Sequence, residues 1–450
     1  MRTALHAVLF IVATCLAACA SEASYIKRGQ ELAAQGRPDA AIEQLMTVLG
    51  ENPDSWPAHF ALGRVYLDLG RLDDALKAFE LARKGGDAPE LLAALASAYG
   101  RKHDGNRAAM FMEQAVKADP QNAANHLRLG IARQQLGDWT LAIEAYRAAL
   151  TIDPTIAEAR VRLGLGLKEQ KRIDEALATL KAAVGELRGT GRAYAAAQEA
   201  LAETYEAAGM LDYALHTYRL TIKVEPNMLP ALLGASRVLR AKGQPELAIE
   251  TLVQAARTLA SEPSLFLELG LAYRDYHLDE QAIEAFTKAL ALPPSAPLAY
   301  APLVDLLIQT KAPAAQVSRL IEQGLAALPA DPDLHMRSGD LALSKNAVAQ
   351  AIEEYRRVTG LQPGNADALY KLGAAQADSG DLAGAKESSR SLRILDAAKA
   401  TTLDALIDKA AVAPAPPPPP TDAVKPPPAT RPDRGKNKKK SKKRGGKRGR

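Results

Sequence analysis

The sequence predicts an all-α protein in which helical hairpins of nearly constant length follow one another along the chain. Small residues recur at steps of 33 to 35 residues, with a single step of 38, and two further sets of residues recur in the same frame. Aromatic residues make up only 5% of the 450 residues, and alanine dominates the apolar content. This composition favours closely packed helices over a β-sandwich.

Each repeat is defined by two small residues and a proline. The small residue that opens each second helix is Ala41, Ala75, Ala108, Ala142, Ala176, Ala214, Ala248, Ala282, Val317, Ala351 or Ala385. Another small residue stands twelve positions earlier, as at Gly63 and Gly130, and a proline often stands twelve positions later, as at Pro154. Larger side chains at the small positions would push apart two helices that cross closely. The proline ends the second helix because it lacks an amide hydrogen.

The end of each first helix also has a signature. Residues expected there in a left-handed conformation are Gly36, Gly70, Gly137, Gly209, Gly243, Gly380 and Asn346. His103 and His277 occupy the same place in other repeats, where a polar residue is tolerated. We therefore expect short turns between the two helices of each hairpin.

The repeat resembles the tetratricopeptide repeat, whose 34-residue pattern combines Leu-Gly, Tyr, Ala, an aromatic residue, Ala and Pro. The best copy contains Leu62-Gly63, Tyr66, Gly70, Ala75, Phe79 and Ala82. The resemblance implies a right-handed α-solenoid of about eleven repeats over residues 22–397, with the first helices lining a concave groove. Residues 398–411 form one more amphipathic pattern, which predicts a capping helix over the open end.

Two places depart from the regular repeat. The 38-residue step lies between Ala176 and Ala214 and predicts a longer loop at 185–192, or a joint between a five-repeat and a six-repeat half. The ninth unit, Pro297 to Pro329, lacks the glycine and the aromatic residue and contains internal prolines. It predicts a strained repeat or a local bend.

The amino end predicts a lipoprotein signal peptide at 1–18 and a short linker at 19–24. Its apolar stretch is too short for a spanning helix, and Leu16-Ala17-Ala18-Cys19 resembles the bacterial lipobox. The resemblance implies that Cys19 is lipidated; an ordinary cleavable signal peptide is the alternative. An Asp directly after the lipidated cysteine resembles an inner-membrane retention signal of enteric bacteria. Ala20 stands at that position here, which favours the outer membrane. The only other cysteine, Cys15, lies in the same segment, so the processed chain has no internal disulfide.

The carboxyl end predicts a disordered Pro-rich spacer at 412–434 and a basic disordered tail at 435–450. The basic residues of the tail are Lys436, Lys438, Lys439, Lys440, Lys442, Lys443, Arg444, Lys447, Arg448 and Arg450. The formal net charge is +5, and without these ten residues it is −5. The tail is expected to bind a polyanion: cell wall, lipopolysaccharide, an acidic protein or, in a cytoplasmic protein, nucleic acid. A solubility tail and a Pro-rich docking motif are the alternatives.

The resemblance places client-binding residues on the first helices. The candidates are Phe60, Arg64, Leu127, Ile131, Val161, Leu165, Glu199, Glu203, Glu206, Leu233, Arg237, Arg240, Leu267 and Arg274. The predicted surface is apolar in repeats four and five, acidic in repeat six and basic in repeats seven and eight. These residues could instead be solvated, take part in stacking, or pair acid with base within the solenoid. The family's two-carboxylate clamp, a peptide site that uses Lys and Asn on adjacent first helices, is not expected, because no first helix has Asn at its ninth position.

No enzyme activity, cofactor or metal site is expected. There is no His-x-x-x-His, cysteine pair, phosphate loop or nucleophile elbow. His59, His126 and His335 occupy a position that is usually aromatic and are interpreted as half-buried packing residues.

The function that follows is a protein-interaction scaffold. We expect an outer-membrane lipoprotein facing the periplasm, which binds a client protein segment in its groove and supports assembly of an envelope machine for secretion, pili, motility or outer-membrane assembly. A cytoplasmic adaptor that binds nucleic acid through its tail, and an accessory protein of polysaccharide export, are the alternatives.

Overall fold

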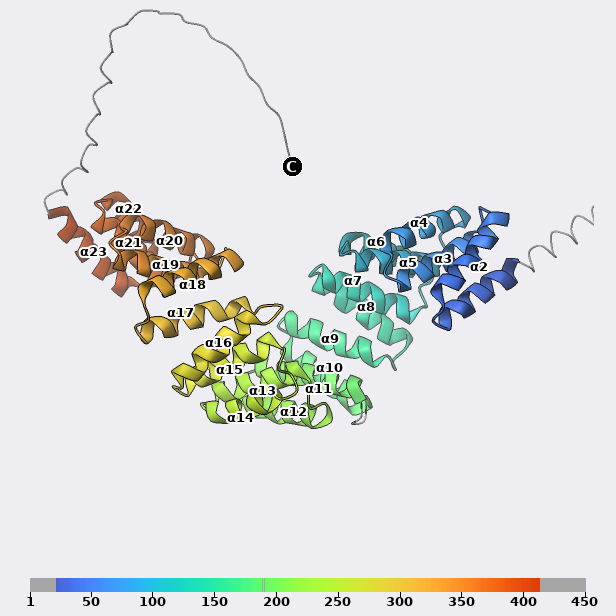
Figure 1. Ribbon diagram of the computed structural model, residues 1–450, viewed down its shortest axis with the longest axis horizontal. Coiled ribbons are helices and arrows are strands. Elements are labelled where there is room, and N and C mark those ends of the chain that lie inside the picture. Colours follow the sequence, from blue (N-terminus) through green and yellow to red (C-terminus); the bar gives the residue numbers. More distant parts are fainter. Residues whose placement is uncertain (1–21, 188, 190, 413–450) are drawn as a thin grey trace, which may run out of the picture. The chain divides into compact units, whose positions relative to one another are not determined.

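The computed structural model describes residues 22–187, 189 and 191–412. In these residues the regular structure is helical, with no strand (Figure 1). The chain divides into two compact units, with the boundary between Pro313 and Ala314. The expected all-α class is thereby confirmed, whereas Cys19, the signal segment and residues 413–450 lie outside the described residues.

The first unit contains eight successive hairpins and one further helix. Its first helix covers residues 22–34. The others are α2 (Pro38–Glu51), α3 (Trp56–Asp68), α4 (Leu72–Ala82), α5 (Pro89–Arg101), α6 (Gly105–Ala118), α7 (Ala123–Gln135), α8 (Trp139–Ile152), α9 (Ala157–Glu169), α10 (Ile173–Leu187), α11 (Gly191–Ala207), α12 (Leu211–Val224), α13 (Leu229–Ala241), α14 (Pro245–Ala255), α15 (Pro263–Asp275), α16 (Asp279–Ala291) and α17 (Tyr300–Gln309). Each helix packs on the next one along the chain.

The second unit begins with a single helix and continues with two hairpins. Its helices are α18 (Ala314–Ala327), α19 (Pro332–Ser344), α20 (Val348–Leu361), α21 (Ala366–Asp378), α22 (Leu382–Leu395) and α23 (Ala397–Val412). Helix α23 packs on α21 and α22, and its Leu403 and Ile407 are buried against them. It lies where the sequence predicts the capping helix.

The hairpins close through the small residues that the sequence singles out. Ala142 of α8 is completely buried, and Gly130 of α7 lies against the ring of Tyr146. A Cβ atom at Gly130 would lie 2.4 Å from Tyr146 Cε1, and one at Gly63 would lie 2.5 Å from Phe79 Cδ1. At these two positions the glycine is therefore required by a buried ring of the partner helix.

The turns within hairpins have the expected backbone conformation. The predicted positions have positive φ angles at Gly36, Gly70, Gly137, Gly209, Gly243, Gly380, Asn346, His103 and His277. At Asn346 the φ angle is 61°, in the left-handed region that Asn tolerates better than most residues. Each turn reverses the chain, so that the second helix returns beside the first.

The two irregular places have structural explanations. The residues added by the 38-residue step lengthen α11 to 17 residues, against 13 in α9 and α13, so the predicted longer loop is wrong. Three residues, 188–190, separate α10 from α11. The ninth predicted repeat contains the boundary between the two units, and its helices α17 and α18 belong to different units.

Candidate functional site

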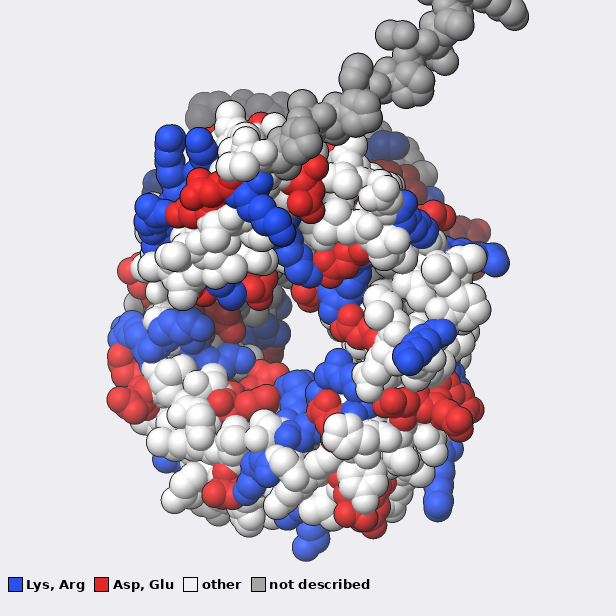
Figure 2. Space-filling view, turned by 90° about the vertical axis from the view of Figure 1, so that its left-hand side faces the viewer, with Lys and Arg blue, Asp and Glu red and all other residues white. Residues whose placement is uncertain are grey.

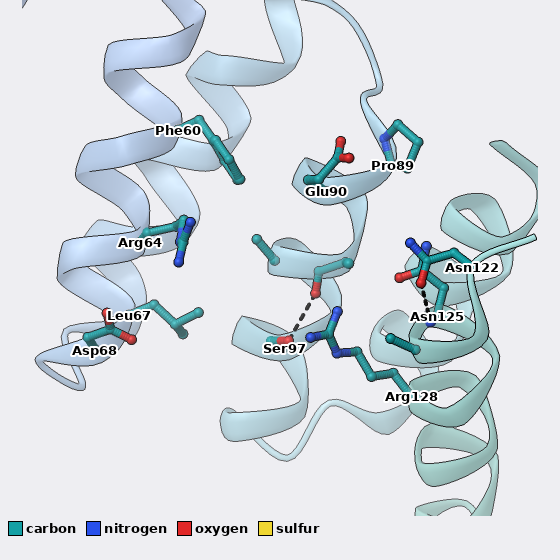
Figure 3. Close-up of a pocket in the computed structure, with 13 residues that line it drawn as sticks. Phe60, Arg64, Leu67, Asp68, Pro89, Glu90, Ser97, Asn122, Asn125 and Arg128 are labelled. Carbon is teal, nitrogen blue, oxygen red and sulfur yellow. Dashed lines mark hydrogen bonds between the residues drawn. The ribbon is translucent and has the colours of Figure 1, made fainter. Parts of the chain in front are cut away.

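The first helices of the second, third and fourth hairpins, α3, α5 and α7, enclose a pocket of about 350 Å³ (Figure 3). Phe60 and Arg64 of α3 form one wall, Ala93, Ala94 and Ser97 of α5 form the middle, and Asn125 and Arg128 of α7 form the other wall. The small side chains of α5 leave room between the larger residues of its neighbours. We call this set of residues the α3–α5–α7 pocket.

Neighbouring contacts hold the walls of the pocket in place. The Phe60 ring lies 6.0 Å from the ring of Phe79, measured between centroids, which fixes it from behind. Arg101 of α5 donates a hydrogen bond from Nη1 to the carbonyl oxygen of Leu67 at 2.5 Å and ties α5 to α3. On α7, the Asn122 side chain caps the helix by accepting a hydrogen bond from the Asn125 amide at 3.2 Å.

Two guanidinium groups in this pocket are free to bind a ligand. Arg64 and Arg128 are both exposed and reach into the space from opposite sides (Figure 3). Among the described residues, neither makes a side-chain hydrogen bond or an ion pair. Asp68 and Glu90 also line the pocket, so its walls carry both signs of charge. The pocket can bind carboxylates through the arginines and apolar groups against Phe60.

A second cavity of about 340 Å³ continues the pocket along α5 and α7. Ser97 and Arg128 line both cavities, and Ile131, another predicted binding residue, lines the second. The predicted residues Phe60, Arg64 and Ile131 therefore lie along one continuous surface. Ser97 and Arg128 line both cavities and lie at the centre of this surface, but they are not among the residues predicted from the sequence. Arg128 directly follows the predicted Leu127, so including the next helix position would have identified it.

Most of the predicted apolar residues pack inward. Leu127 and Ile131 contact the buried cluster around Tyr146, and Val161 and Leu165 contact the cluster around Tyr218. Leu233 and Leu267 are half-buried on α13 and α15. These residues therefore pack between helices, which is one of the alternatives to client binding that the sequence leaves open. As a result, repeats four and five offer less apolar surface to a client.

The predicted acidic and basic patches pair with each other. Glu203 of α11 binds Lys168 Nζ of α9 at 2.8 Å, and Glu206 binds Arg237 Nε of α13 at 3.2 Å. We call this series of pairs, with those of Arg240 below, the charge ladder. It joins neighbouring first helices, because residues 31 to 35 positions apart lie side by side in consecutive repeats.

The charge ladder continues onto α15. Arg240 Nη1 lies 3.1 Å from Glu268 Oε2, and its Nε lies 2.7 Å from Asp275 Oδ2. Arg274 Nη2 lies 3.4 Å from the other carboxylate oxygen of Asp275, Oδ1. On the face drawn in Figure 2, acidic and basic side chains also stand next to one another. These charges already have partners within the chain, unlike Arg64 and Arg128.

One carboxyl group on α11 titrates close to neutral pH. Burial and the neighbouring carboxylate of Glu203 together raise the pKa of Glu199 to about 7. Lys168 and Arg237 oppose this shift but do not cancel it. The first-helix surface therefore changes its charge within the physiological pH range.

Comparison with protein families identifies the repeat. A family model described as tetratricopeptide repeat matches residues 26–89, 93–157 and 127–191, and a second model described as TPR repeat matches residues 339–380. These parts of the chain consist of tetratricopeptide repeats. None of the curated proteins matches it.

Several solved structures are similar to parts of this chain. MamA is 25% identical over 35% of this chain and 93% of its own, with a TM-score of 0.34. PilW, a widely conserved type IV pilus biogenesis factor, is 22% identical over 46% of this chain and 94% of its own, with a TM-score of 0.42. A tetratricopeptide repeat protein from Parabacteroides merdae is 17% identical over 56% of this chain and 98% of its own, with a TM-score of 0.46. These likenesses carry no information about function.

Four tetratricopeptide repeats share a contact that sequence reasoning missed. The fourth residue of the first helix donates a hydrogen bond to a proline carbonyl six residues earlier: His59 to Pro53 at 2.8 Å, His126 to Pro120 at 3.0 Å, Arg160 to Pro154 at 2.7 Å and His335 to Pro329 at 3.0 Å. The spacing of Pro and a donor six positions later is the signal that predicts it. The histidines therefore hold the turn between repeats, in addition to the packing role that the sequence suggests.

Tetratricopeptide repeats generally serve as protein-interaction scaffolds. In the described residues no group of three or more His, Cys, Asp or Glu side chains is placed to hold a metal ion. None of the helices described within residues 22–412 has the length and apolar character that crossing a membrane requires.

Proposed function

We propose that this protein is an interaction scaffold that binds a client protein segment in the α3–α5–α7 pocket. The observation that carries the proposal is the pair of unpartnered guanidinium groups, Arg64 and Arg128, on opposite walls of a pocket with small residues in its middle. Such a pair favours a segment that carries a carboxylate, since guanidinium groups form strong charge-assisted hydrogen bonds with carboxylates. An apolar side chain next to that carboxylate would lie against Phe60.

The charge ladder supports this choice of position. A client that bound over α11, α13 and α15 would have to break ion pairs of the chain or leave them beneath it. No such penalty applies at Arg64 and Arg128. The proposed client site therefore lies in the first third of the chain.

Photo-crosslinking in cells tests the client site. A photoreactive amino acid at Phe60 should crosslink a client peptide that mass spectrometry can define, and the synthetic peptide should then bind the purified protein in calorimetry. The double variant R64E/R128E should weaken that binding by at least about a hundredfold, since each of the two charged hydrogen bonds contributes about 1.5–3 kcal/mol.

Arg219 provides the control. Arg219 is exposed on α12, the second helix of the hairpin that α11 begins, and it does not line the pocket. The variant R219E should therefore bind the peptide as the wild type does. Equal crosslinking from Arg219 and Phe60, or full affinity in R64E/R128E, would contradict the proposal.

We further propose that Cys19 is lipidated and that the protein resides at the bacterial outer membrane, facing the periplasm, where it supports assembly of an envelope machine. The support is the lipobox-like Leu16-Ala17-Ala18-Cys19. A fatty-acid analogue should label the wild type and leave C19A unlabelled and in the soluble fraction. Labelling of neither protein, with both in the cytosol, would refute this localisation and favour the cytoplasmic adaptor.

The basic tail at 435–450 is proposed to bind a polyanion at the cell envelope. Its ten Lys and Arg residues and absence of acidic residues support electrostatic binding without sequence preference. Deletion of residues 435–450 should abolish salt-sensitive binding to lipopolysaccharide or cell-wall polymer and leave binding of the client peptide unchanged. If the deletion leaves polyanion binding intact, the tail is a solubility element.

A further inference from the structure

An apolar groove of about 370 Å³ lies between the second helices α2 and α4, with α3 beneath it. Met46 and Leu49 of α2 and Leu81 of α4 form its sides, and Leu62 and Tyr66 of α3 form its floor. Met46 and Leu81 leave 52% and 40% of their surfaces exposed, so the apolar lining is accessible to solvent. The groove is separate from the α3–α5–α7 pocket and shares no residue with it.

The shape and chemistry of this groove suit a hydrocarbon chain. On α3, His59, Leu62 and Tyr66 line it over about 10 Å, at a rise of 1.5 Å per residue. The His59 side chain already has a partner, because its Nε2 bonds to the Pro53 carbonyl oxygen at 2.8 Å. At the far end the Arg71 guanidinium lies 4.5 Å from the centre of the Tyr66 ring.

A peptide is a poorer occupant than a hydrocarbon. An extended peptide needs partners for its backbone N–H and C=O groups. Most of the lining consists of the aliphatic and aromatic groups of Met46, Leu49, Leu62, Tyr66 and Leu81. The His59 Nε2 is engaged with Pro53 and the Asp74 carboxylate with Arg71, which leaves the single ammonium group of Lys77, too few groups to pair the repeating N–H and C=O groups of a peptide backbone. An alkyl chain requires no hydrogen bond and buries its methylene groups there.

The amino end of the described chain adjoins this groove. The Glu22 carboxylate accepts a hydrogen bond from Asn52 Nδ2 at 3.1 Å and another from the Ser55 hydroxyl. Asn52 directly precedes Pro53, which lines the groove. Cys19 stands three residues before Glu22, a distance of at most about 10 Å of extended chain.

We propose that the groove between α2 and α4 binds an acyl chain attached to Cys19. This inference rests on the proposed function, which supplies the lipid. The groove covers part of one acyl chain while the protein is in water, and the chain leaves it when a bilayer is available, because a bilayer buries every methylene group. The groove thus shelters the anchor between the two membranes of the envelope.

A fluorescent fatty acid tests the groove independently of lipidation. We expect one molecule of cis-parinaric acid to bind saturably to the chain that starts at residue 19 and carries C19A. M46R should weaken binding by about tenfold or more, the effect of leaving about two methylene groups unburied. M110R is the matched control, because Met110 is 42% exposed on α6 and does not line the groove. Absence of saturable binding, or equal binding by M46R at an unchanged helical content, overturns the inference.

A photoreactive fatty acid fed to cells tests the occupant. In detergent-free buffer, irradiation of the labelled wild type should crosslink Cys19 to peptides from α2 and α4, and M46R should lose the crosslink. If Cys19 is labelled but does not crosslink to α2 and α4, the proposal that the groove binds the acyl chain is refuted, whereas the proposed lipidation of Cys19 remains supported. Absence of label on Cys19 overturns the anchor, and with it this inference, even if cis-parinaric acid binds.

Discussion

Replacement of Gly130 by alanine tests whether the repeated glycine is required by helix packing. Gly130 lies in the middle of α7, where the added Cβ would be 2.4 Å from Cε1 and 2.6 Å from Cδ1 of Tyr146. Tyr146 is fully buried, and its hydroxyl donates a hydrogen bond to Gln134 Oε1 at 2.6 Å. The ring cannot withdraw without strain or loss of this bond.

The expected loss of stability follows from opposing contributions. Overpacking of a close-packed core typically costs about 1–3 kcal/mol, and loss of the tyrosine hydrogen bond would add about 1 kcal/mol. Alanine in place of glycine within a helix contributes about 1 kcal/mol in the opposite direction. We therefore expect G130A to reduce the free energy of unfolding by about 1–3 kcal/mol.

Urea unfolding followed by circular dichroism provides the measurement, with G50A as the control. Gly50 lies in α2, and nothing stands within 4 Å of the position that its Cβ would take. This variant should be stabilised by up to about 1 kcal/mol, the gain in helix propensity alone. If G130A is as stable as the wild type, or gains as much as G50A, then the ring of Tyr146 does not account for the glycine.

Three further predictions concern charge and turns. E199Q should stabilise the protein by about 1–2 kcal/mol at pH 8, after allowance for partial exposure, and by little at pH 5. The sign follows from the pKa of Glu199, which rises from 4.5 to about 7 on folding, so that the wild type loses stability as pH increases through this range; equal effects at both pH values in unfolding titrations would contradict it. R240A should cost about 3 kcal/mol, because it leaves Glu268, 14% exposed, without its partner, whereas R356A breaks the exposed pair with Glu353 and should cost under about 1 kcal/mol; similar losses in urea unfolding would refute the difference. H59F should cost about 1–2 kcal/mol through the unpaired Pro53 carbonyl, and an unchanged melting curve would argue against the contact between repeats.

The fold follows from local rules, which explains why the sequence predicts it well. A 34-residue unit contacts mainly its neighbours, so spacing, small residues and turn signals are enough to place the helices. The extra turn of α11 is an instructive failure. The glycines near Thr190 suggest a loop, but the residues after Gly191 continue as helix, because the following run of alanines propagates the helix toward its amino end.

The site is harder to predict because it depends on which side chains find a partner. The sequence places Glu206 in an acidic patch and Arg237 in a basic patch, and it leaves open whether the two residues bind a client or each other. Their 3.2 Å separation in the structure shows that they pair with each other. Arg64 is equally charged in the sequence, yet in the described part of the chain it has no partner. Periodicity reports the helix face of a residue, but it does not report the reach of its side chain.

The sequence by itself determined the helical repeat, its turns and small residues such as Gly63 and Gly130 where paired helices cross, because these depend on residues within one hairpin or its neighbour. The tertiary structure decided that the charged residues of α9 to α15 bind one another, that α3, α5 and α7 leave a pocket with two free arginines, and that an apolar groove adjoins Glu22. These features arise between helices that are one or two repeats apart. Their existence depends on distances of a few ångströms, which a one-dimensional pattern does not contain.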